Sequence, residues 1–287
     1  MIKHSIFLGI ILLIISCSDR TDNQPAGDGW SEVSQQGKGA VTLAYVPSEG
    51  FSYYDENGNL TGVTIELVRD FVQFVYAEHG VELDLQYRPI ENFSEFYNQV
   101  MNAEGGVFGV ANVTITENRK EEIGFSPPYL MNIATLITHQ ETEELESFDE
   151  IMQQFDSLTA LAFEGTLHEE RLVRLIEDYN LGEVPIEYAY SNDEIINKVS
   201  SENEYFAYVD IYNYWRAIND GAEITRHEIG DDSSEQFGVI MPKESDWIEV
   251  WEEFFESGDG YIQSDRYRTL LTEHLGEELA ELLINQM

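Results

Sequence analysis

Cysteine is almost absent from this chain of 287 residues, which contains Cys17 and no other thiol. One cysteine cannot form an intrachain disulfide or a multi-thiolate metal site, so the hydrophobic core alone must stabilise the fold. Basic residues are also scarce, with 15 lysines and arginines against 55 aspartates and glutamates. The net charge of −40 makes nucleic acid and anionic membrane surfaces unfavourable partners. Such acidity is also typical of adaptation to high salt, which screens self-repulsion.

Motifs for metal binding and for common catalytic reactions are missing as well. The six histidines, at positions 4, 79, 139, 168, 227 and 274, show no HxH or HExxH spacing. No GxSxG, GxxxxGK(S/T) or GxGxxG segment occurs, and carboxylates are too abundant for their pairing to indicate acid–base catalysis. The sequence therefore predicts no metal site, no cofactor and no catalytic residue.

The longest apolar run lies at the N-terminus, where residues 6–15 follow Lys3 and His4. This run is short for a transmembrane anchor, and Ser16 before Cys17 is typical of the cleavage site of a bacterial lipoprotein. We predict that residues 1–16 are a signal peptide and that Cys17 carries the lipid. The polar, aperiodic residues 17–39 are predicted to be a tether. The protein would then be anchored at the periplasmic or cell-surface face of a membrane.

From residue 40 onward, the pattern alternates between strands and helices. Short apolar or alternating segments predict strands at residues 41–46, 81–87, 106–113, 184–189, 205–209 and 236–242. Apolar residues at helical spacing lie between them, and Gly80 stands where one such helix should end. Asn57-Gly58 predicts a tight turn. The alternation indicates an α/β fold with a parallel or mixed sheet that helices cover on both faces.

A polar segment directly follows the strand predicted at residues 106–113. Thr116 is expected to cap a short helix, and this helix places Arg119 near the carboxyl end of the strand. There, the guanidinium can donate two parallel hydrogen bonds to a carboxylate, with help from the Thr114 hydroxyl. The alternative is a surface arginine that pairs with Glu121 or Glu122.

The same segment carries a family resemblance. VTITENRKEEIGFSPPYL (113–130) resembles the signature of periplasmic solute-binding proteins for polar amino acids. Four further segments resemble this family in order and spacing: GFSYYDENGNLTGVTIELVRDF (50–71), LTALAFEGTLHEERL (158–172), YFAYVD (205–210) and EQFGVIMPKESDWIEVWEEFFESGDGYIQ (235–263). The resemblance covers about residues 40 to 273.

The resemblance implies the two-lobed periplasmic binding protein fold, with two hinge crossovers and a ligand cleft between the lobes. The crossovers are expected near residues 130–136 and 233–237. Lobe 1 would comprise residues 40–133 together with the return segment and C-terminal helices at 236–287. Lobe 2 would comprise residues 134–235.

The resemblance also implies a set of ligand-binding residues. Arg119, Thr114 and the backbone at Thr166 would hold a ligand α-carboxylate, while Asp210 and the backbone at Asn112 would hold the α-ammonium. Phe51 and Phe93 would flank the ligand side chain, although both are also plausible core residues, and Asp210 is also a plausible helix cap. Phe163 stands where the family often has a basic or small polar residue, which favours a neutral or partly apolar amino acid.

The function that follows is capture of an amino acid, or a similar small zwitterion, by a monomeric lipid-anchored protein that delivers it to an ABC permease. One alternative is a ligand-sensing regulatory module that acts through a separate partner. Another is an enzyme similar to cyclohexadienyl dehydratase, for which Glu164 would be the general acid.

Overall fold

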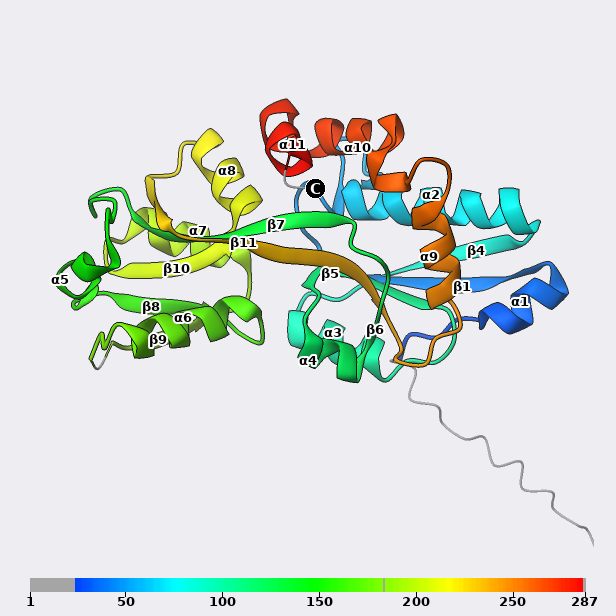
Figure 1. Ribbon diagram of the computed structural model, residues 1–287, viewed down its shortest axis with the longest axis horizontal. Helices are drawn as coiled ribbons and strands as arrows, with labels where there is room; N and C mark the ends of the chain where they lie inside the picture. Colours follow the sequence, from blue (N-terminus) through cyan, green and yellow to red (C-terminus); the bar gives the residue numbers. More distant parts are fainter. Residues whose placement is uncertain (1–23, 183, 286–287) are drawn as a thin grey trace, which may run out of the picture.

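Two lobes lie side by side in the computed structural model, which describes residues 24–182 and 184–285 (Figure 1). The strands β7 (Leu130–His139) and β11 (Ile224–Met241) run through both lobes and join them. The predicted signal peptide and Cys17 lie outside the described residues. Within the described ranges, no helix is long and apolar enough to cross a membrane.

One mixed sheet extends across the molecule. In lobe 1 it contains β4 (Glu82–Pro89), β1 (Lys38–Tyr45), β5 (Val107–Thr114) and the short β6 (Gly124–Phe125). In lobe 2 it contains β10 (Tyr205–Asp210), β8 (Thr159–Phe163) and β9 (Ile186–Ala189). Strand β1 is parallel to β4 and β5, whereas β11 runs antiparallel to β5 and to β7. The predicted α/β fold with a mixed sheet is therefore confirmed.

Helices cover both faces of the sheet in lobe 1. They are α1 (Trp30–Gln36), α2 (Val63–His79), α3 (Phe93–Met101), α4 (Glu117–Glu122), α9 (Ile248–Glu256), α10 (Asp265–Leu275) and α11 (Glu277–Ile284). Helix α2 ends at Gly80 in the left-handed conformation, as predicted. Phe71 of α2 stacks on Trp251 of α9 with ring centroids 3.8 Å apart, and both residues belong to the larger core.

Lobe 2 has the same layered construction with fewer helices. These are α5 (Ile151–Phe155), α6 (Leu167–Asp178), α7 (Asn192–Ser201) and α8 (Ile211–Asn219). Phe155, Leu172 and Phe206 belong to the core on one face of the sheet, and Ile195 and Val199 belong to the core on the other. Single-turn 3-10 helices lie at Phe148–Glu150 and Tyr261–Gln263, and the hairpin strands β2 (Tyr53–Tyr54) and β3 (Leu60–Thr61) flank the predicted Asn57-Gly58 turn.

The prediction that the tether extends to residue 39 was wrong. Helix α1 packs on lobe 1, where Val33 is buried and the Trp30 ring lies 5.2 Å from that of Trp247. The Asp246 carboxylate accepts hydrogen bonds from the backbone N–H groups of Trp30 and Ser31. A helix with so few apolar residues leaves only a weak periodic signal in a polar sequence.

Strand β11 is also longer than the sequence indicated, because the expected strand began only at residue 236. Residues 224–235 are mostly polar, yet they pair with β7. The register between β7 and β11 shifts between His227 and Asp232, and again between Asp232 and Glu235. The lobe boundaries expected at 133/134 and 235/236 fall inside these two strands and stay a prediction.

Candidate ligand-binding site

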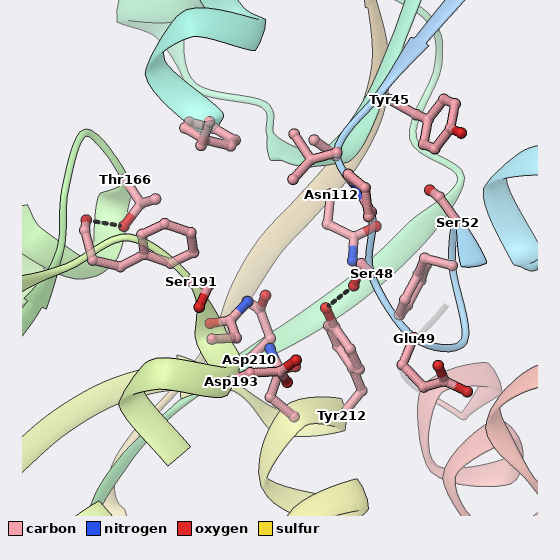
Figure 2. A pocket seen from close by; sticks show the side chains of 18 of the residues that line it. Tyr45, Ser48, Glu49, Ser52, Asn112, Thr166, Ser191, Asp193, Asp210 and Tyr212 are labelled. Carbon is pink, nitrogen blue, oxygen red and sulfur yellow. Dashed lines mark hydrogen bonds between the residues drawn. The ribbon is translucent and has the colours of Figure 1, made fainter. Parts of the chain in front are cut away.

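A cavity of about 520 Å³ lies between the two lobes, where the carboxyl ends of β5, β8 and β10 meet (Figure 2). Open α/β sheets bind their ligands at this end of the strands. All eight residues predicted from the sequence line this cavity: Phe51, Phe93, Asn112, Thr114, Arg119, Phe163, Thr166 and Asp210. The fold thus brings together residues that lie up to 159 positions apart (51 to 210), while their roles in binding stay a prediction.

Arg119 enters the cavity from lobe 1. Thr116 accepts a hydrogen bond from the Arg119 backbone N–H and caps α4, as predicted. The guanidinium Nη1 donates to the Thr114 carbonyl at 3.1 Å, and Cζ lies 5.9 Å and 5.7 Å from the ring centroids of Phe93 and Tyr97. These contacts fix the direction of the guanidinium but leave most of its donors unused.

The guanidinium of Arg119 has no carboxylate within ion-pair distance among the described residues, so the alternative pairing with Glu121 or Glu122 is wrong. Burial lowers the pKa of Arg119, although the group stays cationic at neutral pH. A largely buried cation without a counter-ion is unfavourable in the empty protein. The site is therefore suited to an anionic group on a ligand.

Asp210 enters the cavity from lobe 2, at the end of β10. It occupies the N-cap position of α8, but its side chain makes no capping hydrogen bond, so the alternative role as a cap is wrong. Instead, Oδ1 accepts a hydrogen bond from Asn132 Nδ2 at 2.6 Å and lies 3.1 Å from His168 Nε2. Within the described part of the chain, no lysine or arginine pairs with this carboxylate.

Behind Asp210, five buried or largely buried side chains form a closed circuit that we call the hinge ring: Asp210, Asn132, Glu235, Arg171 and His168. Asn132 Nδ2 also donates to Glu235 Oε2 at 2.7 Å, and Arg171 Nη2 donates to Glu235 Oε1 at 2.5 Å. Arg171 Nη1 lies 3.2 Å from His168 Nδ1 and completes the circuit. The ring joins α6 and β10 of lobe 2 to both hinge strands.

The sequence did not predict the hinge ring. Its members come from four elements, and His168 and Arg171 alone are close in the sequence, three positions apart on α6. One signal was available, because basic residues are scarce and Arg171 lies one turn into the helix that follows the Gly165-Thr166 turn.

The backbone at Thr166 and at Asn112, which the sequence predicted to contact the ligand, is held by contacts within the protein. The Thr166 hydroxyl and backbone N–H both donate to the Phe163 carbonyl, at 2.8 Å and 3.2 Å; Figure 2 shows the hydroxyl contact. Thr166 makes no side-chain hydrogen bond to the first turn of α6, whose backbone N–H groups have no partner within the helix. Asn112 has a φ of 52°, and its Oδ1 accepts a hydrogen bond from the Tyr129 hydroxyl at 2.9 Å.

Aromatic rings close the cavity at two edges. Phe51 of lobe 1 and Tyr212 of α8 have ring centroids 4.5 Å apart, and the Tyr212 hydroxyl lies 2.8 Å from Ser48 Oγ (Figure 2). Burial raises the pKa of Tyr212 to about 12. Phe93 of lobe 1 and Phe163 of lobe 2 have centroids 6.3 Å apart. The two lobes therefore touch across the cavity.

The residue predicted for the alternative enzymatic role lies outside the cavity lining. Glu164, the predicted alternative general acid, is exposed and is not one of the residues that line this cavity. In residues 24–182 and 184–285, no group of three or more His, Cys, Asp or Glu side chains is arranged to hold a metal ion. Among the described residues that line the cavity, Arg119 is a largely buried cation and Asp210 a buried anion, neither of them paired with a carboxylate, lysine or arginine. Together with several aromatic rings, these two charges suit non-covalent binding.

These features define a two-lobed binding protein, and comparison with known proteins gives its family. Residues 41–276 match the bacterial extracellular solute-binding proteins, family 3, and the chain belongs to this family. An ancestral arginine-binding protein bound to arginine shares the fold with a TM-score of 0.66 and 18% identity, covering 83% of this chain and 98% of that one. The arginine-, lysine- and histidine-binding protein ArtJ from Geobacillus stearothermophilus shares the fold with a TM-score of 0.64 and 17% identity. The match covers 83% of this chain and 96% of ArtJ.

Curated relatives match this chain over shorter segments than the family does. The membrane-bound lytic murein transglycosylase F of Pseudomonas fluorescens (strain Pf0-1) is 24% identical over 178 residues, which are 62% of this chain and 32% of that protein. The probable ABC transporter extracellular-binding protein YckB of Bacillus subtilis (strain 168) is 24% identical over 143 residues, 48% of this chain and 46% of YckB. The chain thus spans about a third to a half of the length of these relatives.

Proposed function

We propose that this protein captures an amino acid, or a similar small zwitterion, in the cavity between its lobes. One observation carries the proposal: Arg119 of lobe 1 is a largely buried cation, Asp210 of lobe 2 is a buried anion, and within the described residues neither pairs with a carboxylate, lysine or arginine. Both line the same cavity. A ligand with a carboxylate and an ammonium group supplies both missing partners, and charge-assisted hydrogen bonds in such a site are strong.

The other lining residues complete the proposed site. Thr114 and the first turn of α6, which Thr166 precedes, add donors around the ligand carboxylate. The backbone at Asn112 lies beside the ammonium, and Phe51, Phe93 and Phe163 flank the ligand side chain and exclude water. Because Arg119 and Asp210 belong to different lobes, a bridging zwitterion binds the closed form more tightly than the open form. This difference in affinity is what drives closure in a hinged protein.

We further propose that the protein is held at the outer face of a membrane by a lipid on Cys17 and that it delivers its ligand to an ABC permease as a monomer. The extracellular solute-binding family and the match to YckB support this role. The apolar run before Cys17 supports the anchor.

A sensory role is the second candidate, in which ligand binding regulates a separate partner. The similarity to membrane-bound lytic murein transglycosylase F, over 62% of this chain, favours this alternative. Deletion of the gene distinguishes the two roles, because a transport protein is needed for uptake of its radiolabelled ligand. A sensor leaves uptake unchanged and alters the activity of its partner.

Thermal unfolding of the chain from Ser18 onward, screened singly with the twenty amino acids at low and high salt, tests the binding role. A ligand that binds only the folded state stabilises it by about 2.7 kcal/mol at a hundredfold excess over its dissociation constant. We expect a shift with one or a few amino acids, and no shift in Arg119→Met. The matched control is Arg268→Met, since Arg268 is exposed on α10 and does not line the cavity. The absence of any shift in the wild-type protein would contradict the proposal.

A further inference from the structure

Within the hinge ring, Asn132 and His168 both contact the same carboxylate oxygen of Asp210. We propose that His168 is a positioning residue that makes Asp210 selective for an ammonium group, an inference that rests on the function proposed above. His168 lies on α6, and its side chain is only 8% exposed. It lines the same cavity as Asp210.

The partners of His168 determine which ring nitrogen carries the proton. Arginine has only donors, so the contact between Arg171 Nη1 and His168 Nδ1 requires Nδ1 to accept. The proton of the neutral imidazole is therefore on Nε2, which lies 3.1 Å from Asp210 Oδ1 and donates to it. Arg171 thus fixes the tautomer, and the tautomer makes His168 a donor to Asp210.

The two donors leave one oxygen of Asp210 for a ligand. Asn132 and His168 both donate to Oδ1, whereas no hydrogen bond to Oδ2 is found in the described part of the chain. With Oδ1 held from two sides, the carboxylate has one orientation, and Oδ2 is the atom that remains for an ammonium N–H in the cavity. A preoriented acceptor loses less conformational entropy when the ligand binds.

The charges of the hinge ring also favour a cationic group at this position. Arg171 is the one arginine in the ring, and it pairs with Glu235 and with Asp232, the latter at 3.0 Å. Asp210 receives only neutral donors, so its negative charge is not compensated within the ring. An uncharged group in place of the ammonium would leave this buried charge unpaired.

A purely structural role for His168 makes a different prediction. If the hinge ring only held α6 against the hinge strands, loss of His168 would weaken binding of every ligand to the same extent. If His168 positions Asp210, the loss affects only ligands that carry an ammonium group. The ratio of two dissociation constants, for an amino acid and for the α-hydroxy acid with the same side chain, separates these cases.

The experiment compares wild-type protein with His168→Leu and His168→Gln by isothermal titration calorimetry. The probes are each of the twenty L-amino acids and, for those that bind, the matching α-hydroxy acid. A hydrogen bond to a charged group corresponds to about 10- to 100-fold in affinity. His168→Leu should therefore lower the preference for the amino acid over the matching α-hydroxy acid, measured as the ratio of their dissociation constants, at least about tenfold. The glutamine amide can donate to Asp210 and accept from Arg171, so His168→Gln should keep most of the preference.

Two controls keep the outcome unambiguous. His139→Leu removes another buried histidine of lobe 2, which lies outside the hinge ring and the cavity lining, and should leave the preference unchanged. Nitrogen-15 NMR of the ligand-free protein at neutral pH should show His168 as the Nε2–H tautomer, and the other tautomer would overturn the inference. If amino acids bind and His168→Leu keeps the wild-type preference, the inference alone is wrong. If no amino acid binds the wild-type protein, the proposed function is wrong and the inference falls with it.

Discussion

At the scale of single residues, Arg119 and Asp210 are costly for the empty protein. Each is a buried or largely buried charge, and among the described residues Arg119 has no carboxylate partner and Asp210 has no lysine or arginine partner. Thr116 caps α4, and α8 begins without a side-chain cap from Asp210. The two charges therefore lower the stability of the ligand-free folded protein, and both face one cavity. Such destabilising residues are a common property of binding sites.

His227 has a different role, because it is buried in lobe 2 away from the cavity lining. Its Nδ1 accepts a hydrogen bond from the Leu145 backbone N–H at 3.0 Å, and Nε2 lies 2.8 Å from Thr138 Oγ1. Burial lowers the pKa of His227 to about 4 from its ordinary value of 6.5. The folded state thus binds fewer protons than the unfolded state between these two pH values, and stability must fall as the pH falls through this range.

We predict that His227 contributes about 3 kcal/mol to the loss of unfolding free energy between pH 7 and pH 4. Urea denaturation over this range should show a smaller pH dependence for His227→Gln than for the wild-type protein. The variant is expected to be less stable at pH 7, because the glutamine side chain does not hold its acceptor where the His227 ring holds Nδ1 for the Leu145 N–H. Equal slopes for the two proteins would show that His227 is not held in its neutral form.

At the scale of elements, the turn between β8 and α6 approaches α3 of the other lobe very closely. Gly165 has a φ of +74°, and a Cβ atom there would lie 2.3 Å from Ser94 Oγ. The turn therefore favours glycine for its left-handed conformation, and a Cβ atom would force the Ser94 hydroxyl to rotate away before the lobes could approach this closely.

Gly165→Ala should therefore disfavour the closed form. We expect amino acid affinity to fall about tenfold or more, while the free energy of unfolding without ligand falls by only about 1 kcal/mol. Ser94→Ala removes the oxygen that the new methyl group would meet, so the double variant should recover part of the lost affinity. Calorimetry of the two single variants and the double variant checks this, and strictly additive effects would show that the two positions do not meet.

Much of the element order could be predicted from the sequence, because buried strands and amphipathic helices leave periodic signals. Helix α2 and its end at Gly80, the buried strand β5 and the cap at Thr116 are examples. Helix α1 and the first two thirds of β11 were missed, because their polar sequences fold through pairing with distant segments rather than through a strong local pattern. The hinge ring was missed for the same reason, since it joins residues from α6, β7, β10 and β11.

At the scale of the whole molecule, the net charge of −40 opposes compact folding through self-repulsion. Added salt screens repulsion between exposed charges that lie more than a Debye length apart, and this length falls from about 10 Å at 0.1 M to about 3 Å at 1 M. We predict that the midpoint of thermal unfolding rises between 0.05 M and 1 M sodium chloride. Tetramethylammonium chloride should act similarly, whereas sucrose at the same osmolarity controls for solvent exclusion. A midpoint that fell with salt would show that attractive ion pairs dominate.

The central claim is that one zwitterion bridges Arg119 of one lobe and Asp210 of the other. Isothermal titration calorimetry of the best amino acid from the thermal screen, against wild-type protein, Arg119→Met and Asp210→Asn, tests it most directly. Loss of one partner of a buried charge pair costs about 3 to 5 kcal/mol, so each variant should bind at least about a hundredfold more weakly. Wild-type affinity in either variant would contradict the account.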